Sequence, residues 1–227
     1  GLSNYNYSVL IARDGVERPI DDSGAPIRDE QGAISGAVLT FRDVSEQRHA
    51  QKAAALAADR VSRLQAFTAA LSEAITLAQV AQVAVEQSYP ALDNAQGALL
   101  TLLEPATRRF NIVSSMGYPQ ANIDHWQQLA FDADLSVMEM LKNKLPLFIE
   151  NTKDWETRYP KIYEAVISPG LAVLPLHIDD AILGSLLIGF SSIRTFSPED
   201  RAFLETLARQ CAQAIYRAQL FEAERLA

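Results

Sequence analysis

Hydrophobic and polar positions alternate in three short stretches near the start of the chain. The alternation predicts strands over about 7–12, 17–27 and 34–41, and Asp14-Gly15 between the first two is a strong signal for a tight hairpin turn. We therefore expect an antiparallel sheet. Because a sheet of this size does not bury two faces by itself, we expect either preceding residues or a partner chain to cover it.

A long helix is expected to follow the third strand directly. The triplet Asp43-Val44-Ser45 joins the two elements without a loop. Asp43 or Ser45 can accept hydrogen bonds from the free N–H groups of the first helical turn. From there to about residue 71 the chain has neither proline nor glycine, which predicts one continuous helix. Apolar positions near its end recur at three-four spacing and predict a seam for helix packing: Leu64, Phe67 and Leu71.

The remainder of the chain mixes helices and strands. Its last helix is expected to begin at Ser197, which caps the helix, with Pro198 in the first helical position. The other predicted elements are a helix over 76–87, strands over 97–103 and 109–115, helical segments near 134–144 and 154–167 around a strand at 147–150, and strands over 171–178 and 182–190.

Two stretches resemble known domain families. The segment DGVERPIDDSGAPIRDEQGAISGAVLTFRDVSEQR resembles the carboxy-terminal strands of a PAS domain, with Asp43-Val44-Ser45 at the place of that family's Asp-x-Thr junction. The helical elements of a PAS domain have no counterpart here, so we transfer no PAS cofactor to this chain. The segment LAVLPLHIDDAILGSLLIGFSSIRTFSPEDRAFLETLARQCAQAI resembles the last hairpin and closing helix of a GAF domain, as found in bacterial sensor kinases and sensor-linked phosphatases.

The resemblances imply an α+β fold and a division of the chain. We expect a GAF-type antiparallel sheet flanked by helices, preceded by a partial PAS antiparallel sheet and a long linker helix. The expected segments are the carboxy-terminal PAS strands over 1–44, a signalling helix over 45–70, the GAF domain over 64–219, and a closing and exit helix over 198–227 that leads to an output domain. That output is expected to be a histidine kinase, with a serine/threonine phosphatase as the alternative.

Composition and charge exclude several classes of function. The chain of 227 residues has 20 Lys and Arg against 28 Asp and Glu, a net charge of −8, and no basic block, so we expect no nucleic-acid partner. Its longest apolar runs, such as 181–190, are far shorter than the ~20 residues of a membrane-spanning helix. A single cysteine rules out an internal disulfide and favours a reducing cytoplasm.

No enzymatic or metal-binding motif is found. The histidines 49, 125 and 177 are scattered, with His125 expected in a loop, and none has a ligand-like neighbour. Cys211 is expected to be a core thiol, so we expect no covalent bilin, no metal and no catalysis in this segment. Cys211 belongs to a second seam, and both seams are expected to form a packed helix interface, either within the chain or in a dimer. The helices that carry them are expected to pair in a parallel homodimer. The residues of the second seam are Leu204, Leu207, Cys211, Ala214, Ala218 and Phe221.

Aromatic residues with polar groups concentrate in the segments 115–135 and 150–170, which the GAF resemblance places around a ligand. Two hypotheses remain open: these residues bind an unidentified small molecule, or they fill space in a ligand-free dimerisation and relay module. In either case the expected function is sensing or relay through helices to a distant output. The candidate binding residues are Tyr118, His125, Trp126, Phe131, Trp155, Tyr159 and Tyr163.

Overall fold

The computed structural model describes residues 8–88, 92, 94–107, 109–128, 141–151, 153 and 168–226, without the side chains at 125, 128 and 226. The chain divides into two compact units, Gly1–Val61 and Ser62–Ala227. The helix α1 (Ser45–Glu73) runs through the point of division.

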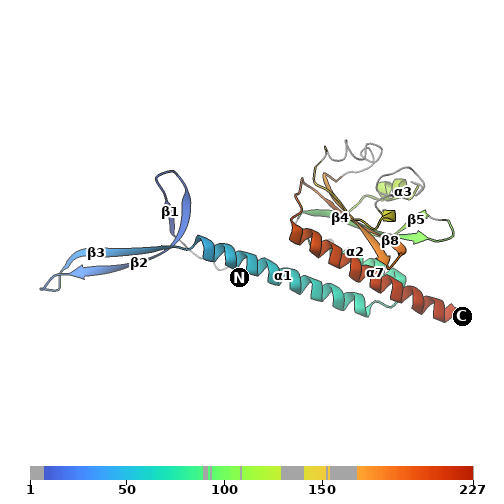
Figure 1. Ribbon diagram of the computed structural model, residues 1–227, viewed down its shortest axis with the longest axis horizontal. Coiled ribbons are helices and arrows are strands. Elements are labelled where there is room, and N and C mark those ends of the chain that lie inside the picture. Colours follow the sequence, from blue (N-terminus) through green and yellow to red (C-terminus); the bar gives the residue numbers. More distant parts are fainter. Residues whose placement is uncertain are drawn as a thin grey trace. The chain divides into compact units, whose positions relative to one another are not determined.

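The first unit contains two successive antiparallel hairpins (Figure 1). Strand β1 (Ser8–Ile11) pairs with the start of β2 (Glu17–Arg28), and β3 (Ile34–Asp43) pairs with the rest of β2. The antiparallel order β1-β2-β3 agrees with the alternation in the sequence.

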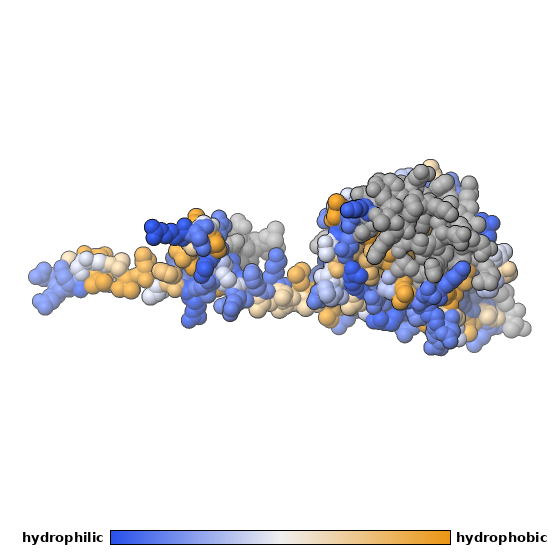
Figure 2. Space-filling view, turned by 45° about the horizontal axis from the view of Figure 1, so that its top comes forward, coloured by the Kyte–Doolittle hydropathy of each residue, from blue (hydrophilic) through white to orange (hydrophobic). Residues whose placement is uncertain are grey.

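No described residue between 8 and 61 is buried. Leu39 is 72% exposed and Phe41 63% exposed, and Figure 2 shows hydrophobic side chains on the surface of these hairpins. A sheet that is held only by the hydrogen bonds between its strands is at best marginally stable. The described part of the first unit therefore has no hydrophobic core of its own.

The second unit is built on a five-stranded antiparallel sheet with the order β5-β4-β8-β7-β6. Its strands are β4 (Ala95–Glu104), β5 (Arg109–Met116), β6 (Leu147–Ile149), β7 (Gly170–Ile178) and β8 (Ala181–Phe190). Its helices, besides the end of α1, are α2 (Leu77–Ser88), α3 (Gln120–Gln128) and α7 (Pro198–Leu226).

Helices cover one face of this sheet and form the main core (Figure 1). The end of α1 contributes Phe67, α2 contributes Val80, and α7 contributes Leu204, all of them against alternate residues of β4, β7 and β8 such as Leu100 and Leu186. We call the opposite side of the sheet the outer face. Buried apolar residues that do not belong to the main core gather there: Leu99, Ile123, Leu141, Leu147, Ile149, Leu171 and Val173.

One element differs from expectation. His125 and Trp126 lie in the helix α3 and not in a loop. The carbonyl of Pro119 accepts the first hydrogen bonds of this helix, from the N–H groups of Asn122 (3.0 Å) and Ile123 (3.4 Å), and Ile123 is buried. The expected helical segments near 134–144 and 154–167 lie largely outside the described residues.

Candidate functional site: the outer face and two helix junctions

Two glycines lie directly opposite one another on the outer face of the sheet. Gly97 of β4 is the register partner of Gly189 of β8, so a bare patch of backbone forms between the two strands. The ring of Tyr118 lies on this patch. A methyl group at position 97 would come 2.8 Å from Cε2 of Tyr118, and one at position 189 would overlap its hydroxyl. Only glycine leaves room for the ring at both positions.

The Tyr118 hydroxyl is held by three partners. It donates to the carbonyl of Gly97 (3.4 Å), and it is hydrogen-bonded to the Ser168 hydroxyl and to the backbone of Gly189. The ring of Trp126 on α3 meets the Tyr118 ring edge-on, with centroids 5.1 Å apart. We call Gly97, Gly189, Ser168 and Trp126 together the Tyr118 seat.

Burial raises the pKa of the Tyr118 hydroxyl, and the hydrogen bonds from Ser168 and Gly189 only partly oppose this effect. The phenol therefore stays neutral at physiological pH. A neutral phenol with satisfied partners positions groups by hydrogen bonding and is a poor base.

Only part of the expected aromatic cluster can be placed. The structure brings Tyr118 and Trp126 together on the outer face, with His125 next to Trp126 on α3. The other four candidates lie outside the described residues: Phe131, Trp155, Tyr159 and Tyr163. Sequence reasoning missed Gly97, Gly189 and Ser168, because their role depends on strand register. In the sequence, the seat was indicated only by Tyr118, an aromatic residue directly after Gly117.

A buried pair of polar side chains also lies on the outer face, at the centre of the sheet. Thr101 and Ser185 are register partners on β4 and β8, and their hydroxyl oxygens are 2.7 Å apart. Both residues are at least nine-tenths buried. Each hydroxyl therefore satisfies the other in an otherwise apolar layer.

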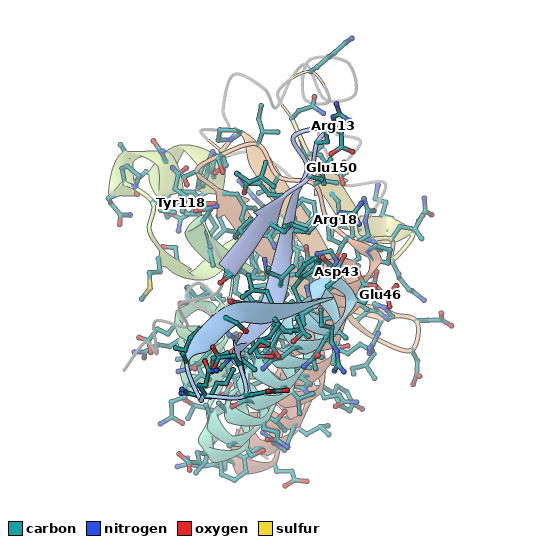
Figure 3. The ribbon with its side chains drawn as sticks, turned by 90° about the vertical axis from the view of Figure 1, so that its left-hand side faces the viewer. Arg13, Arg18, Asp43, Glu46, Tyr118 and Glu150 are labelled. Carbon is teal, nitrogen blue, oxygen red and sulfur yellow. The ribbon has the colours of Figure 1, made fainter. Side chains whose placement is uncertain are left out.

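The entry junction comprises Arg18, Asp43, Val44 and Ser45, where β3 passes into α1. The N–H of Ser45 donates to Oδ1 of Asp43 (2.9 Å), and Arg18 lies 3.7 Å from the same carboxylate (Figure 3). The N–H of Val44 donates to Pro19 of β2 (3.1 Å). Of the two expected capping residues, Asp43 accepts the bond. Hydrogen bonds from the Ser45 side chain and backbone lower the pKa of Asp43, with a smaller contribution from Arg18.

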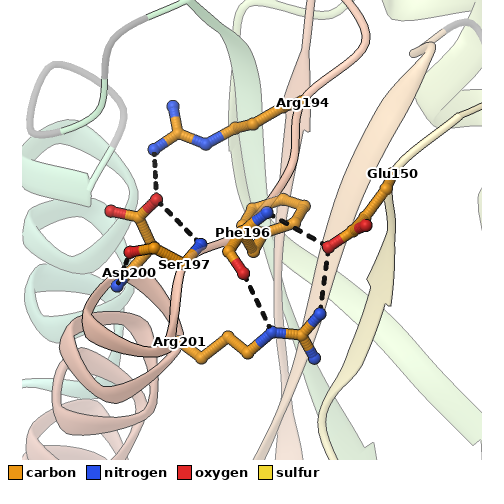
Figure 4. Close-up of polar contacts among 6 residues, drawn as sticks. All are labelled: Glu150, Arg194, Phe196, Ser197, Asp200 and Arg201. Carbon is orange, nitrogen blue, oxygen red and sulfur yellow. Dashed lines mark hydrogen bonds and ion pairs between the residues drawn. The ribbon is translucent and has the colours of Figure 1, made fainter.

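The exit junction joins the end of β6 to the start of α7 (Figure 4). Oε1 of Glu150 accepts from the N–H of Phe196 (3.1 Å) and from Nη2 of Arg201 (3.0 Å). The Nε of Arg201 donates to the Phe196 carbonyl (3.2 Å), and its guanidinium lies 4.5 Å from the ring centroid of Phe148 on β6. The first turn of α7 is thereby fixed to the last residues of the edge strand.

A capping box completes the exit junction. The N–H of Asp200 donates to Oγ of Ser197 (3.1 Å), and the N–H of Ser197 donates back to Asp200 (3.4 Å). Arg194 pairs with the same carboxylate at 3.3 Å, and both side chains are less than one fifth exposed. The expected cap at Ser197 and the start at Pro198 are confirmed.

Comparison with known proteins identifies the family of the second unit. A family model described as "GAF domain" matches residues 74–215, which is more than half of the chain. The chain belongs to the GAF domain family. No curated protein matches the sequence.

Several solved structures share the fold. The domain from a phosphoenolpyruvate-protein phosphotransferase of Coxiella burnetii is 20% identical with a TM-score of 0.62, and covers 74% of this chain and 98% of its own. The equivalent domain from Acinetobacter is 17% identical with a TM-score of 0.59, covering 70% and 94%. A domain assigned to a two-component sensor histidine kinase protein of Sinorhizobium meliloti 1021 is 20% identical with a TM-score of 0.53, covering 66% and 96%. These likenesses agree with the expected α+β fold.

The expected dimer seams lie mostly inside the GAF domain. Cys211 is fully buried, and burial raises its pKa far above the ordinary range of a thiol. Its neighbours in the seam pack within the same chain, so they are not available to a partner chain. The residues concerned are Phe67, Leu71, Leu204, Leu207, Cys211, Ala214 and Ala218, whereas Leu64 is partly buried and Phe221 is 39% exposed.

Within the described part of the chain, no group of three or more His, Cys, Asp or Glu residues is placed to hold a metal ion. No helix among the same residues is both long enough and apolar enough to cross a membrane.

Proposed function

We propose that this chain is the sensory and relay part of a bacterial, cytoplasmic signal transduction protein, and that its output is a histidine kinase. Membership of the GAF family supports a sensory role, and the likeness to a domain of a sensor kinase protein favours that output. A serine/threonine phosphatase is the alternative output. In this proposal the chain itself acts without catalysis: its one cysteine is buried, and the carboxylates of Asp200 and Glu150 are held in ion pairs with arginines at the start of α7.

The exit junction is the observation that carries the proposal. Leu147 and Ile149 of β6 contribute to the outer face, and the next residue, Glu150, bonds the backbone at the start of α7. A ligand or packing change on the outer face that shifts β6 therefore moves the first turn of α7. Because α7 continues as one helix of 29 residues, the shift is passed along its length.

The helices carry this change in a homodimer. Their outward sides retain apolar residues that the chain does not cover: Val61 on α1 is 54% exposed, and Tyr216 and Leu220 on α7 are 44% and 50% exposed. Tyr216 and Leu220 are four residues apart, which places them on one side of the helix. Pairing of α1 and α7 with their copies covers these side chains.

The ligand-free relay module is the second candidate. It is favoured by one observation: the Tyr118 ring already occupies the glycine patch of the outer face. In that case the signal enters through the first unit and α1, and the GAF domain serves as a rigid partner for the exit helix.

Native mass spectrometry and light scattering on the purified chain test the proposal. We expect a dimer, which Leu220→Asp converts to a monomer and which the matched variant Ile193→Asp preserves, because Ile193 is 67% exposed outside α7. A wild-type monomer at high concentration contradicts the relay mechanism. A retained small mass assigns the domain to ligand sensing, and a dimer without added mass assigns it to relay.

A further inference from the structure

The Tyr118 seat is shaped for a phenol. Its floor is backbone, because Gly97 and Gly189 face each other with no side chain between them and the ring. Its polar end supplies three groups to one hydroxyl: the Gly97 carbonyl, the Gly189 backbone and the Ser168 hydroxyl. Its wall is the ring of Trp126, whose plane lies at 82° to that of the Tyr118 ring. The seat thus combines a flat floor, an aromatic wall and converging polar groups at one end, which are features that small-molecule sites share.

The occupant is attached to the chain by a short connection. Tyr118 follows β5, which ends at Met116, and precedes α3, which begins at Gln120. Tyr118 does not belong to the main core on the helix face of the sheet. The contacts of the ring are therefore separate from those of the helix-side core.

We propose that the Tyr118 seat is a binding site for planar hydroxyaromatic molecules, and that Tyr118 fills it as an internal competitor. An external phenol takes the three hydrogen bonds and the ring contact with Trp126 only when the Tyr118 side chain swings out. The binding step does not depend on the function proposed above, whereas its meaning as a signal does.

The internal competitor sets a threshold for ligands. A side chain tethered by a short connection competes at an effective concentration of about millimolar or higher. An external ligand must therefore bind the open seat far more tightly than that, which requires contacts beyond the phenol ring itself. Simple phenol binds measurably once the tyrosine ring has been removed.

The test is removal of the ring and replacement by free phenol. Tyr118→Ala leaves a ring-shaped void, and we expect Tm to fall by about 5–10 °C, followed by recovery of about 3–5 °C in about 5 mM phenol. Toluene, which lacks the hydroxyl, should give a clearly smaller recovery. Wild-type protein should show no increase at the same phenol concentration.

Two controls separate the seat from a generic cavity. Phe203→Ala opens a ring-sized void in the main core, where Phe203 is 6% exposed, and such an apolar void should favour toluene over phenol. Adding Ser168→Ala to Tyr118→Ala should weaken phenol binding about five- to tenfold in calorimetry and leave toluene binding nearly unchanged.

Several outcomes decide the matter. The proposal is overturned if the folded Tyr118→Ala protein gains no more from phenol than wild type does, or if toluene is as effective as phenol. Should Tyr118→Ala not fold, the milder Tyr118→Val is used in the same comparison; if both unfold in buffer, refolding in phenol supports the site and failure to refold contradicts it. None of these results changes the dimer measurement above, so the two proposals fail independently.

Discussion

The exit junction makes a quantitative prediction for Glu150. Its carboxylate bonds the N–H of Phe196 at 3.1 Å and Arg201 at 3.0 Å, and the Glu150 side chain is 29% exposed. A hydrogen bond to a charged acceptor contributes about 1.5 kcal/mol at this degree of burial. The ion pair contributes about 0.5 kcal/mol, because Arg201 is 43% exposed and screened by water. We expect Glu150→Ala to lower the free energy of unfolding by about 2 kcal/mol.

Glu150→Gln separates the two contributions. The amide oxygen still accepts from the N–H of Phe196 but carries no charge toward Arg201, so the expected loss is only about 0.5–1 kcal/mol. A double-mutant cycle between Glu150→Ala and Arg201→Met should give a coupling energy of about 0.5–1 kcal/mol. Glu73→Ala, at an exposed glutamate at the end of α1, is the matched control and should stay within about 0.5 kcal/mol of wild type.

Urea unfolding followed by tryptophan fluorescence is a suitable assay. Both tryptophans, Trp126 and Trp155, lie in the second unit, so the signal reports the GAF domain without contribution from the hairpins. Hydrogen exchange should also show faster exchange of the Phe196 amide in Glu150→Ala. A loss below about 0.5 kcal/mol together with unchanged exchange at Phe196 would refute the role of Glu150 in holding α7.

Three further results are expected. Because the pKa of Asp43 is lowered in the folded chain, the protection of the Ser45 amide should persist above the ordinary pKa of an aspartate and be lost as pH falls through the lowered value; pH-dependent hydrogen exchange measures this, and equal protection in Asp43→Ala, which removes the acceptor, contradicts it. Cys211 should not react with a thiol reagent such as DTNB in the folded protein and should react fully in urea; fast reaction without denaturant would show that it is not a core thiol. Leu204→Ala should lower the free energy of unfolding by about 3 kcal/mol, whereas Ile193→Ala, at an exposed position before α7, should change it by less than about 0.5 kcal/mol. Urea unfolding measures both values, and equal losses in the two variants would contradict the position of Leu204 in the core.

Local patterns in the sequence predicted most of the fold. Strand alternation, the absence of proline and glycine between residues 45 and 73, and the Ser197-Pro198 cap each depend on neighbours within a few positions. The helix α3 was missed because its start depends on the carbonyl of Pro119 and on burial of Ile123, a weak local signal with strong tertiary support.

The candidate site was less predictable than the fold. The meeting of Gly97 with Gly189 depends on the register of β4 against β8, and the bond from Arg201 to Glu150 joins residues 51 positions apart. Neither leaves a periodic trace in the sequence. The seam through Cys211 had the correct spacing, but spacing alone does not distinguish packing against the chain's own sheet from packing against a partner.

The hydroxyl pair of Thr101 and Ser185 also determines how β4 and β8 can assemble. Apart from their glycines, most residues of these strands in the sheet interior are apolar, so a slip of two positions would preserve the alternation of apolar residues. Such a slip would place Thr101 opposite Leu183 or Leu187 and leave two buried hydroxyls without partners, at a cost of about 2–6 kcal/mol in total. The pair thus favours the correct register of β4 against β8, because it destabilises a misaligned sheet more than it stabilises the correct one.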